Sequence, residues 1–233
     1  MSDRSASIDT QSVKPPIASF FARHWWLFLL PACLAAYLFV VSLLVETGQR
    51  SDLLSGVPAA DTGSVSNTYF ESALFIAPWH TSAKVKYATW LRTYAVSGLV
   101  AEQNLDQEVI LERVLGLYTS AMQDRPMWPY YHLGAFDAEY LLNKPESVIQ
   151  ERFDSITALA PNERGLDRNL IELSLYSWSK LRADQKAWIV QRLKSTQHRI
   201  RKDMLALIGD LKAYNPDLCV QMPWNLVRRP CRE

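Results

Sequence analysis

The stretch WWLFLLPACLAAYLFVVSLLV, residues 25–45, decides the architecture of this chain of 233 residues. It contains no charged side chain, and a helix of that length measures roughly 30 Å, the thickness of the hydrocarbon core of a bilayer. A helix is also the only structure in which a single segment satisfies its backbone polar groups in lipid. Trp25 and Trp26 stand where interfacial aromatic residues are common, and Pro31 is expected to kink the helix at most. The stretch therefore predicts a single transmembrane helix.

Two other interpretations of this stretch are a buried core helix and a cleaved signal peptide. A signal peptide has a shorter apolar region, about 7–15 residues, followed by a cleavage site of small residues. The present stretch is longer and is followed by ETGQR. A core helix rarely carries apolar residues on every face. An uncleaved anchor is therefore favoured.

The charges on either side of the anchor predict its direction. Residues 10–24 contain Lys14 and Arg23 and no acid, whereas residues 46–60 contain one Arg and two acids. An excess of Lys and Arg before the helix places the N-terminus in the cytoplasm. We therefore expect residues 1–24 to be a cytoplasmic tail and the bulk of the chain to be extracytoplasmic.

The composition changes twice after the anchor. Residues 46–66 are rich in Gly, Ser, Asp and Thr, which is typical of a linker. Residues 67–213 are poor in Gly and rich in straight-chain residues, which favours helices, and no segment alternates with period two for long enough to predict a strand. Residues 214–233 are expected to form a C-terminal tail. The predicted fold class is all-α, with one transmembrane helix followed by an extracytoplasmic array of antiparallel helical hairpins.

Capping residues predict where individual helices begin and end. Apolar residues recur at spacings of three and four through residues 106–123, which predicts a helix there. Pro145 is expected at the first position of a helix, and Asn162 is expected to cap a helix that ends near Leu181. The apolar pattern over residues 188–211 predicts one long helix or two short ones.

Three segments align without gaps and indicate an internal repeat. In each, an aromatic residue is followed three residues later by a small or aliphatic residue, and five residues after that by proline. The segments are 70–73 with Pro78, 118–121 with Pro126, and 153–156 with Pro161. The pattern is similar to the second half of a tetratricopeptide repeat, a unit of about 34 residues, with an insertion near residues 98–104. We predict a degenerate tetratricopeptide-like (TPR-like) array, with a generic helical bundle as the alternative.

The sequence contains no arrangement of residues typical of a catalytic or metal site. A Gly-rich phosphate loop, a nucleophile elbow and an HExxH motif are all missing, and the histidines have no Cys or acidic partner at the spacing of a metal site. These histidines are His24, His80, His132 and His198. We expect no catalytic residue, no cofactor and no metal, and predict that the protein is not an enzyme. The formal net charge of +1 gives no indication of nucleic acid as a partner.

The aromatic residues are candidates for a binding groove. Aromatic faces stack on sugar rings or accept peptide side chains in a concave groove. The candidates are Trp90, Tyr94, Trp128, Tyr130, Tyr131 and Trp178. The alternative is that most of these rings pack between helices. The basic run at residues 198–202 is typical of a solvated helix face, with contact to an anionic lipid or an anionic glycan as the alternative.

Two of the three cysteines bracket a short C-terminal loop. Cys219 and Cys231 both lie on the oxidising side of the membrane if the predicted orientation is right. A disulfide between them would contribute about 3 kcal/mol to stability, and the alternative is two free thiols. Cys33, inside the apolar stretch, is expected to be a packing residue.

Three longer segments resemble a known family. RPMWPYYHLGAFDAEYL (residues 125–141), APNERGLDRNLIELSLYSW (160–178) and LRADQKAWIVQRL (181–193), together with the anchor, resemble VpsP-type polysaccharide-biosynthesis proteins. These are small bacterial membrane proteins encoded among exopolysaccharide and biofilm-matrix genes, and the resemblance covers residues 66–213. It implies assembly or export of a cell-surface polysaccharide, and with the predicted orientation it implies an inner-membrane anchor and a periplasmic bulk.

Two classes of function follow from this resemblance. The first is an accessory or scaffold protein whose helical array binds other polysaccharide-assembly proteins. The second is direct glycan binding, with Trp128 and Tyr131 as stacking platforms. A general membrane-anchored TPR-like protein that assists periplasmic protein assembly is a further alternative.

Overall fold

The computed structural model describes residues 25–52, 57–59 and 64–232. The cytoplasmic tail predicted for residues 1–24 lies outside the described residues. The chain divides into two units, Met1–Leu43 and Leu44–Glu233, within helix α2 (Trp26–Arg50). The described residues are helical apart from turns and two strands of three residues, which confirms the predicted all-α class.

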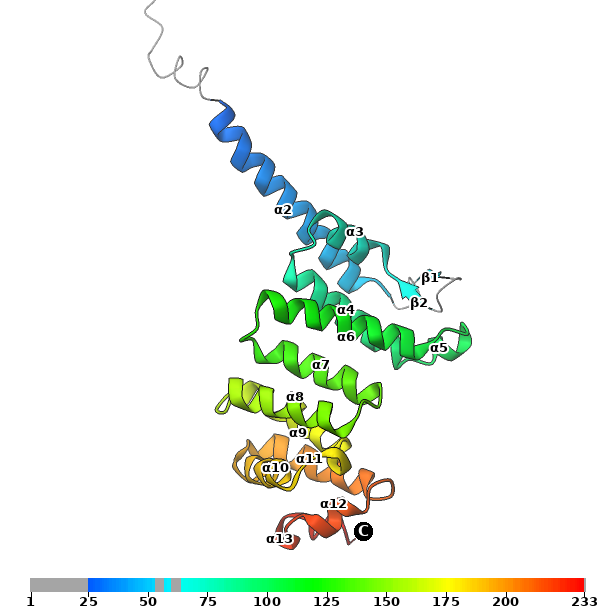
Figure 1. Cartoon of the computed structure of the whole chain (residues 1–233), viewed down its shortest axis with the longest axis vertical. Coiled ribbons are helices and arrows are strands. Elements are labelled where there is room, and N and C mark those ends of the chain that lie inside the picture. The colour runs from blue at the N-terminus through cyan, green and yellow to red at the C-terminus, as the bar shows by residue number, and fades with distance from the viewer. Residues whose placement is uncertain (1–24, 53–56, 60–63, 233) are drawn as a thin grey trace, which may run out of the picture. The chain divides into compact units, whose positions relative to one another are not determined.

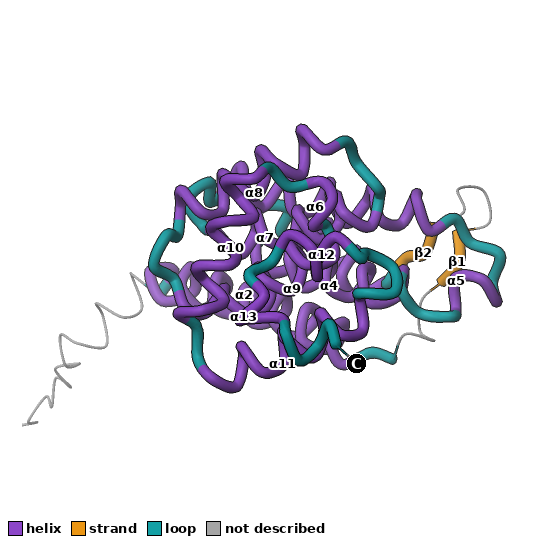
Figure 2. The backbone as a smooth tube through the Cα atoms, turned by 90° about the horizontal axis from the view of Figure 1, so that it is seen from below, coloured by secondary structure: helices purple, strands orange, loops and turns teal. Residues whose placement is uncertain are grey.

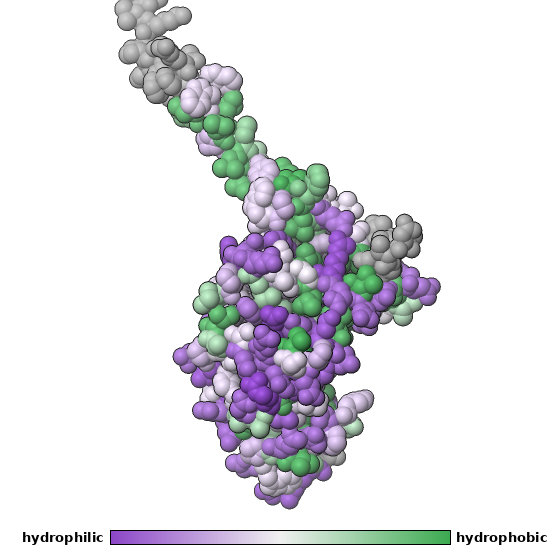
Figure 3. All heavy atoms as spheres, in the orientation of Figure 1, coloured by the Kyte–Doolittle hydropathy of each residue, from purple (hydrophilic) through white to green (hydrophobic). Residues whose placement is uncertain are grey.

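The first unit contains most of the apolar helix. Pro31 lies inside α2 without ending it, and the apolar side chains are largely exposed, with Leu30 at 65% and Phe39 at 68%. Figure 3 shows mostly hydrophobic residues on this helix, whereas the visible face of the second unit is mainly hydrophilic. Among the described residues, α2 is the one helix that is long and apolar enough to cross a membrane. The protein thus has an N-terminal helix that could anchor it in a membrane.

The start of the predicted linker belongs to regular structure. α2 continues to Arg50, five residues beyond the predicted end of the membrane helix. The Asn67 side chain then donates from Nδ2 to the Ser51 hydroxyl at 2.8 Å, which ties the segment that follows α2 to the start of the next helix. Gly48 packs directly against the ring of Phe70: a Cβ at position 48 would lie only 3.0 Å from the ring carbons. The prediction of a linker from residue 46 is therefore corrected, because Gly48 serves close packing here.

The end of the predicted linker forms a short antiparallel ribbon. Strand β1 (Val57–Ala59) pairs with β2 (Ser64–Ser66), in a register that places Val57 opposite Ser66. Val65 is fully buried and fixes the ribbon to the unit. Strands of three residues are too short to produce a period-two pattern, which is why the sequence did not predict them.

The second unit is a succession of helices that run back and forth, each packing on its neighbours (Figures 1 and 2). A 3-10 turn precedes α9 at Arg164–Leu166 and another follows it at Trp178–Lys180. The helices are α3 (Thr68–Ile76), α4 (Thr81–Ala95), α5 (Leu99–Glu102), α6 (Gln107–Asp124), α7 (Pro129–Leu141), α8 (Glu146–Leu159), α9 (Asp167–Tyr176), α10 (Ala183–Ser195), α11 (His198–Leu211), α12 (Asp217–Gln221) and α13 (Trp224–Val227).

The three aligned segments end in turns of the same geometry. We name residues 77–80 turn 1, residues 125–128 turn 2 and residues 160–163 turn 3. The cap residues before the prolines have φ and ψ of −133° and 74° at Ala77, −141° and 76° at Arg125, and −140° and 59° at Ala160. In each turn the N–H of the fourth residue donates to the carbonyl of the first. Proline cannot continue a helix and keeps the preceding residue out of the helical region, which explains why the three turns agree.

The residues of the repeated pattern are buried as their spacing predicts. The aromatic and the small or aliphatic residue of each segment are all buried; these are Phe70, Ala73, Tyr118, Ala121, Phe153 and Ile156. These residues belong to two parts of the core that differ in composition. Aromatic rings and alanines fill the part around α3, α4 and α6, whereas a mainly aliphatic cluster runs from α7 to α13.

Several predicted helix boundaries need correction. Asn162 does not cap a helix; Glu163 accepts a hydrogen bond from the N–H of Gly165 and opens a 3-10 turn, and α9 begins only at Asp167. Pro145 is the N-cap of α8 rather than its first residue. Of the two options for residues 188–211, the structure has two helices, α10 and α11.

The predicted C-terminal tail is part of the folded unit. α12 and α13 bury Leu218, Met222 and Val227 in the aliphatic cluster. This correction has a simple cause. The two helices have five and four residues, and such short helices do not give a periodic apolar stripe.

Candidate functional site

Turns 1, 2 and 3 lie along one edge of the second unit, where α3, α6 and α8 end (Figure 1). Contacts between neighbouring turns support this alignment. Asp124, just before turn 2, accepts hydrogen bonds from Thr81 and from Lys84 of α4, at 3.0 and 2.6 Å. Residues of turns 2 and 3 together line a shallow cavity of about 460 Å³. We call this surface the turn edge.

Large apolar side chains are exposed on the turn edge. Trp79 in turn 1 and Met127 in turn 2 follow the proline directly and are 64% and 74% exposed. Trp128 is 48% exposed, because its extended backbone, held by the following Pro129, keeps it outside α7. The equivalent residues of turn 3, Asn162 and Glu163, are polar. The turn edge is therefore apolar at turns 1 and 2 only.

A polar groove of about 390 Å³ adjoins the turn edge, and Tyr130 lines both surfaces. Its walls come from α4, α7 and α9, the helices that follow the three turns. Arg92 of α4 binds Asp137 of α7 with two hydrogen bonds of 2.7 and 3.2 Å across the groove. Hydroxyl, amide and carboxylate groups line the rest of the groove; they belong to Thr89, Thr93, Asn169 and Glu172. These groups can donate to and accept from a peptide or a sugar.

The structure separates the six aromatic residues that were predicted to share a groove. Trp128 remains close to Tyr130 and Tyr131, with ring centroids 5.7 and 6.4 Å away. Tyr131 itself is buried, so Trp128 and Tyr130 are the exposed pair. Trp90 and Tyr94 stack on each other inside the core, with ring centroids 5.5 Å apart. Their spacing of four residues places them on the buried face of α4.

Trp178 belongs to neither of these groups. It is fully buried in the aliphatic cluster, and its Nε1 donates to Gln221 Oε1 at 3.1 Å. The prediction of one groove is thus corrected to the exposed pair Trp128 and Tyr130. The sequence could not separate the six residues, because large aromatic rings fill cores and binding surfaces alike.

A close contact between Tyr118 of α6 and Gly134 of α7 forms the floor of the polar groove. A Cβ at Gly134 would lie 2.3 Å from the tyrosine ring. The Tyr118 hydroxyl lies 3.3 Å from Thr89 Oγ1, and burial raises the pKa of the phenol. This contact was not predicted from the sequence. The available signal was the glycine inside a helix, which costs about 1 kcal/mol and usually reflects a close approach.

Turn 3 is held by a buried ion pair. Arg192 of α10 donates to the carbonyls of Pro161 and Glu163, both at 2.9 Å, and its Nε bonds Asp167. Asp167 is 2% exposed and also accepts from the Thr196 hydroxyl at 2.8 Å. The guanidinium therefore joins the turn, the start of α9 and α10.

Turn 2 is held differently. The ring of His132 lies 3.0 Å from the Pro126 carbonyl through Nε2, and 3.4 Å from Arg152 of α8 through Nδ1. Arg152 in turn binds Glu139, which is 3% exposed, with its shortest contact at 2.7 Å. The charged pair of this hairpin thus reaches the turn only through the histidine.

The C-terminal cysteines are joined. A disulfide links Cys219 of α12 to Cys231, with Cα atoms 5.8 Å apart. Lys212 Nζ donates to the carbonyl of Pro230 at 3.1 Å, so the last residues are also attached to the end of α11. These links place Arg228 and Arg229 beside α11, where they line a basic cavity.

Of the other described histidines, His80 caps a helix and His198 lines the basic cavity. His80 accepts from the Ala83 N–H at 3.1 Å as the cap of α4, and His24 lies outside the described residues. Within residues 25–52, 57–59 and 64–232, no three His, Cys, Asp or Glu side chains gather as a metal site would require. The turn edge and the polar groove are the candidate binding surfaces of the described residues. Comparison of the chain with protein-family models, with curated proteins and with solved structures gave no match.

Proposed function

We propose that this protein is a membrane-anchored accessory or scaffold protein of bacterial exopolysaccharide (biofilm matrix) biosynthesis or export. It acts by binding other polysaccharide-assembly proteins. In this proposal α2 is held in the inner membrane with the N-terminus in the cytoplasm, and the degenerate TPR-like array lies in the periplasm. The resemblance to VpsP-type proteins supports the process, and the charges that flank the apolar stretch support the orientation.

The observation that carries the binding role is the exposure of Trp79, Met127 and Trp128 on the turn edge. Neighbouring large apolar side chains on a rigid surface are typical of protein interfaces, in which Trp contributes strongly to affinity. The equivalent backbone of turns 1 and 2 presents Trp79 and Met127 at the same position after the proline. A partner helix with apolar residues at regular spacing has the chemistry to cover such an edge.

The experiment is a pull-down of the full chain from detergent-solubilised bacterial membranes. The test variant is Trp79→Ala/Trp128→Ala, and the control is Tyr214→Ala, an aromatic residue that is 86% exposed but lies beyond the end of α11. We expect wild type and control to recover envelope glycan-assembly proteins. Because hot-spot residues each contribute about 2 kcal/mol or more, recovery by the double variant should fall at least about tenfold.

Equal recovery by all three proteins would show that the turn edge is not the binding surface. Recovery of only translocon or cytochrome-maturation factors would favour the general alternative, in which the protein assists periplasmic protein assembly.

A second candidate function is direct glycan binding. The exposed rings of Trp128 and Tyr130, 5.7 Å apart, adjoin the polar groove and have the chemistry to stack on a sugar while the groove binds its hydroxyls. Titration with the native polysaccharide, followed by tryptophan fluorescence, tests this function. An unchanged spectrum at millimolar sugar, with normal function of Trp128→Ala, would exclude it.

A further inference from the structure

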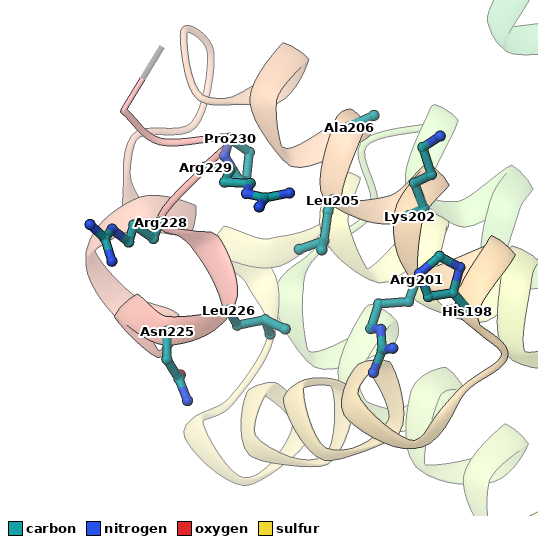
Figure 4. A pocket seen from close by; sticks show the side chains of 10 residues that line it. All are labelled: His198, Arg201, Lys202, Leu205, Ala206, Asn225, Leu226, Arg228, Arg229 and Pro230. Atoms are coloured by element: carbon teal, nitrogen blue, oxygen red, sulfur yellow. The ribbon is translucent and has the colours of Figure 1, made fainter.

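A basic cavity of about 690 Å³ lies between the first turns of α11 and the segment that follows α13. Four cationic side chains and a histidine line it: Arg201, Lys202, Arg228, Arg229 and His198. Figure 4 shows that Arg229 directs its guanidinium toward α11, and that Leu205 and Leu226 project into the space between the two elements. The cavity thus combines a cationic rim with an apolar floor.

The cationic groups of this rim lack acidic partners. No acidic residue lines the cavity. Arg201 donates to the carbonyl of Lys194 at 3.2 Å, a neutral group. Among the described residues, none of the four cationic side chains forms an ion pair with an acid, although other basic residues of the unit, such as Arg168 with Asp203, do. The donors of Arg229 and Lys202 remain available to a ligand.

The position of the cations on α11 is locally unfavourable. The first turn of α11 has no acidic residue and no side-chain cap, yet it begins with His198 and continues with Arg199, Arg201 and Lys202. Cations near a helix N-terminus oppose the helix dipole and so destabilise the helix. The Cys219–Cys231 disulfide and the Lys212 contact hold the following segment beside α11, and Arg229 of that segment points toward the helix, whereas Arg228 points away from it (Figure 4). A cluster of cations at a helix start that disfavours them is typical of a ligand site.

We propose that this cavity binds an anionic carbohydrate, the carboxylate-bearing chain of an acidic polysaccharide. Guanidinium groups bind carboxylates with two parallel hydrogen bonds, and the floor of Leu205 and Leu226 provides an apolar surface for the CH faces of a sugar ring. The cavity is open and is formed by two elements, so a chain can pass across it. It differs from the turn edge, and the inference stands without the proposed function.

The place of the cavity in the second unit favours a soluble polymer over a lipid headgroup. The residues of α2 that belong to this unit contact α3 and α4, through Gly48 with Phe70 and Glu46 with Lys86, whereas α11 and α13 form the opposite end of the helical succession (Figure 1). An anionic lipid is therefore treated as an outcome of the test.

The test is calorimetric titration of the full chain, held in nanodiscs of phosphatidylcholine, with oligogalacturonate. Dextran serves as a neutral polymer, and inorganic phosphate serves as a small anion. The test variant is Arg201→Gln/Arg229→Gln. The control is Arg50→Gln/Arg168→Gln, which removes the same charge from exposed positions that do not line the cavity. Cosedimentation with phosphatidylglycerol vesicles forms a separate arm.

We expect oligogalacturonate to bind and dextran not to bind. Since charge-assisted hydrogen bonds are lost, binding should weaken at least about tenfold in the test variant and less than about twofold in the control. It should also weaken as salt is added. Equal weakening in both variants, no binding, or phosphate binding as tight as that of the oligomer would overturn the proposal. Binding to vesicles without binding to oligogalacturonate would assign the cavity to anionic lipid instead.

Discussion

Turns 2 and 3 have nearly the same backbone conformation, but they differ in the contacts that hold them and in the side chains they expose. Their cap residues, Arg125 and Ala160, differ by 1° in φ and by 17° in ψ. Turn 3 is fixed by Arg192, a buried cation that binds two of its carbonyls, whereas turn 2 has one carbonyl beside a partly buried histidine. Turn 2 displays Met127 and Trp128 where turn 3 displays Asn162 and Glu163.

This difference shows that the backbone conformation of the turn does not depend on its exposed side chains. Proline and the small or aliphatic residue five positions before it determine the backbone, because one ends the helix and the other packs inside. The two side chains after the proline are then free to vary. One turn can expose apolar groups for binding while the other is locked to the helix behind it.

The largest expected effect comes from Arg192→Ala, which breaks the lock on turn 3. The change leaves the buried Asp167 with only the Thr196 hydroxyl and a longer contact to Arg164, at 3.4 Å. Removing one partner of a buried ion pair costs about 3 kcal/mol or more. Urea unfolding of the full chain in non-ionic detergent, followed by tryptophan fluorescence, measures the loss.

The matched variant for turn 2 is His132→Ala. It removes a hydrogen bond to one carbonyl, so we expect a loss of only about 1 kcal/mol. Equal losses in the two variants would contradict the idea that turn 3 is more tightly held than turn 2.

A medium effect is expected from Gly134→Ala in the hairpin of turn 2. The new Cβ would meet the Tyr118 ring at 2.3 Å, and overpacking of this kind costs about 1–3 kcal/mol. The equivalent position beside turn 3 is Asn169, which is exposed. Asn169→Ala should therefore leave the unfolding midpoint nearly unchanged, and a destabilisation as large as that of Gly134→Ala would show that the glycine has no special role.

The smallest effect concerns pH. A hydrogen bond from Lys84 lowers the pKa of Asp124, the residue before turn 2, and the residue at the equivalent place before turn 3 is the apolar Leu159. A lowered pKa in the folded state adds stability above the ordinary pKa of Asp, and that stability is lost as pH falls through the folded value. Unfolding free energy should fall below about pH 4. Asp124→Asn should flatten part of this fall; an identical pH profile would mean that other carboxylates cause it.

Much of the fold could be predicted from the sequence, because the signals were local. The charge-free stretch, the stripe in α6 and the three prolines each encode their structure within a few residues. The β1–β2 ribbon could not be predicted, because a single buried valine, Val65, holds it to the unit. The same is true of α12 and α13, which are held by three scattered apolar residues that contact distant parts of the chain. Asn162 was predicted to be a helix cap because of its residue type. It lies inside turn 3, however, and Glu163 caps the 3-10 turn that follows.

The candidate site was predicted less completely than the fold. Trp128 and Tyr130 were among the six aromatic residues expected in a groove, but exposure depends on which helix faces solvent, and that is decided by packing. The walls of the polar groove come from three helices separated in sequence, and the basic cavity joins α11 to residues beyond α13. Neither arrangement has a signature within a single segment.

The end formed by α12 and α13 has a consequence for how copies of the protein can meet. A stacked helical array that ends without a cover exposes an apolar face on which another copy can add. Here Leu218, Met222 and Val227 turn inward over the last long helices, and Arg228 and Arg229 are exposed. Val220 and Trp224 also remain exposed here, at 80% and 54%. Two copies that meet through this same end therefore bring arginines of like charge together beside these apolar side chains, whereas the apolar face of the last long helices stays covered.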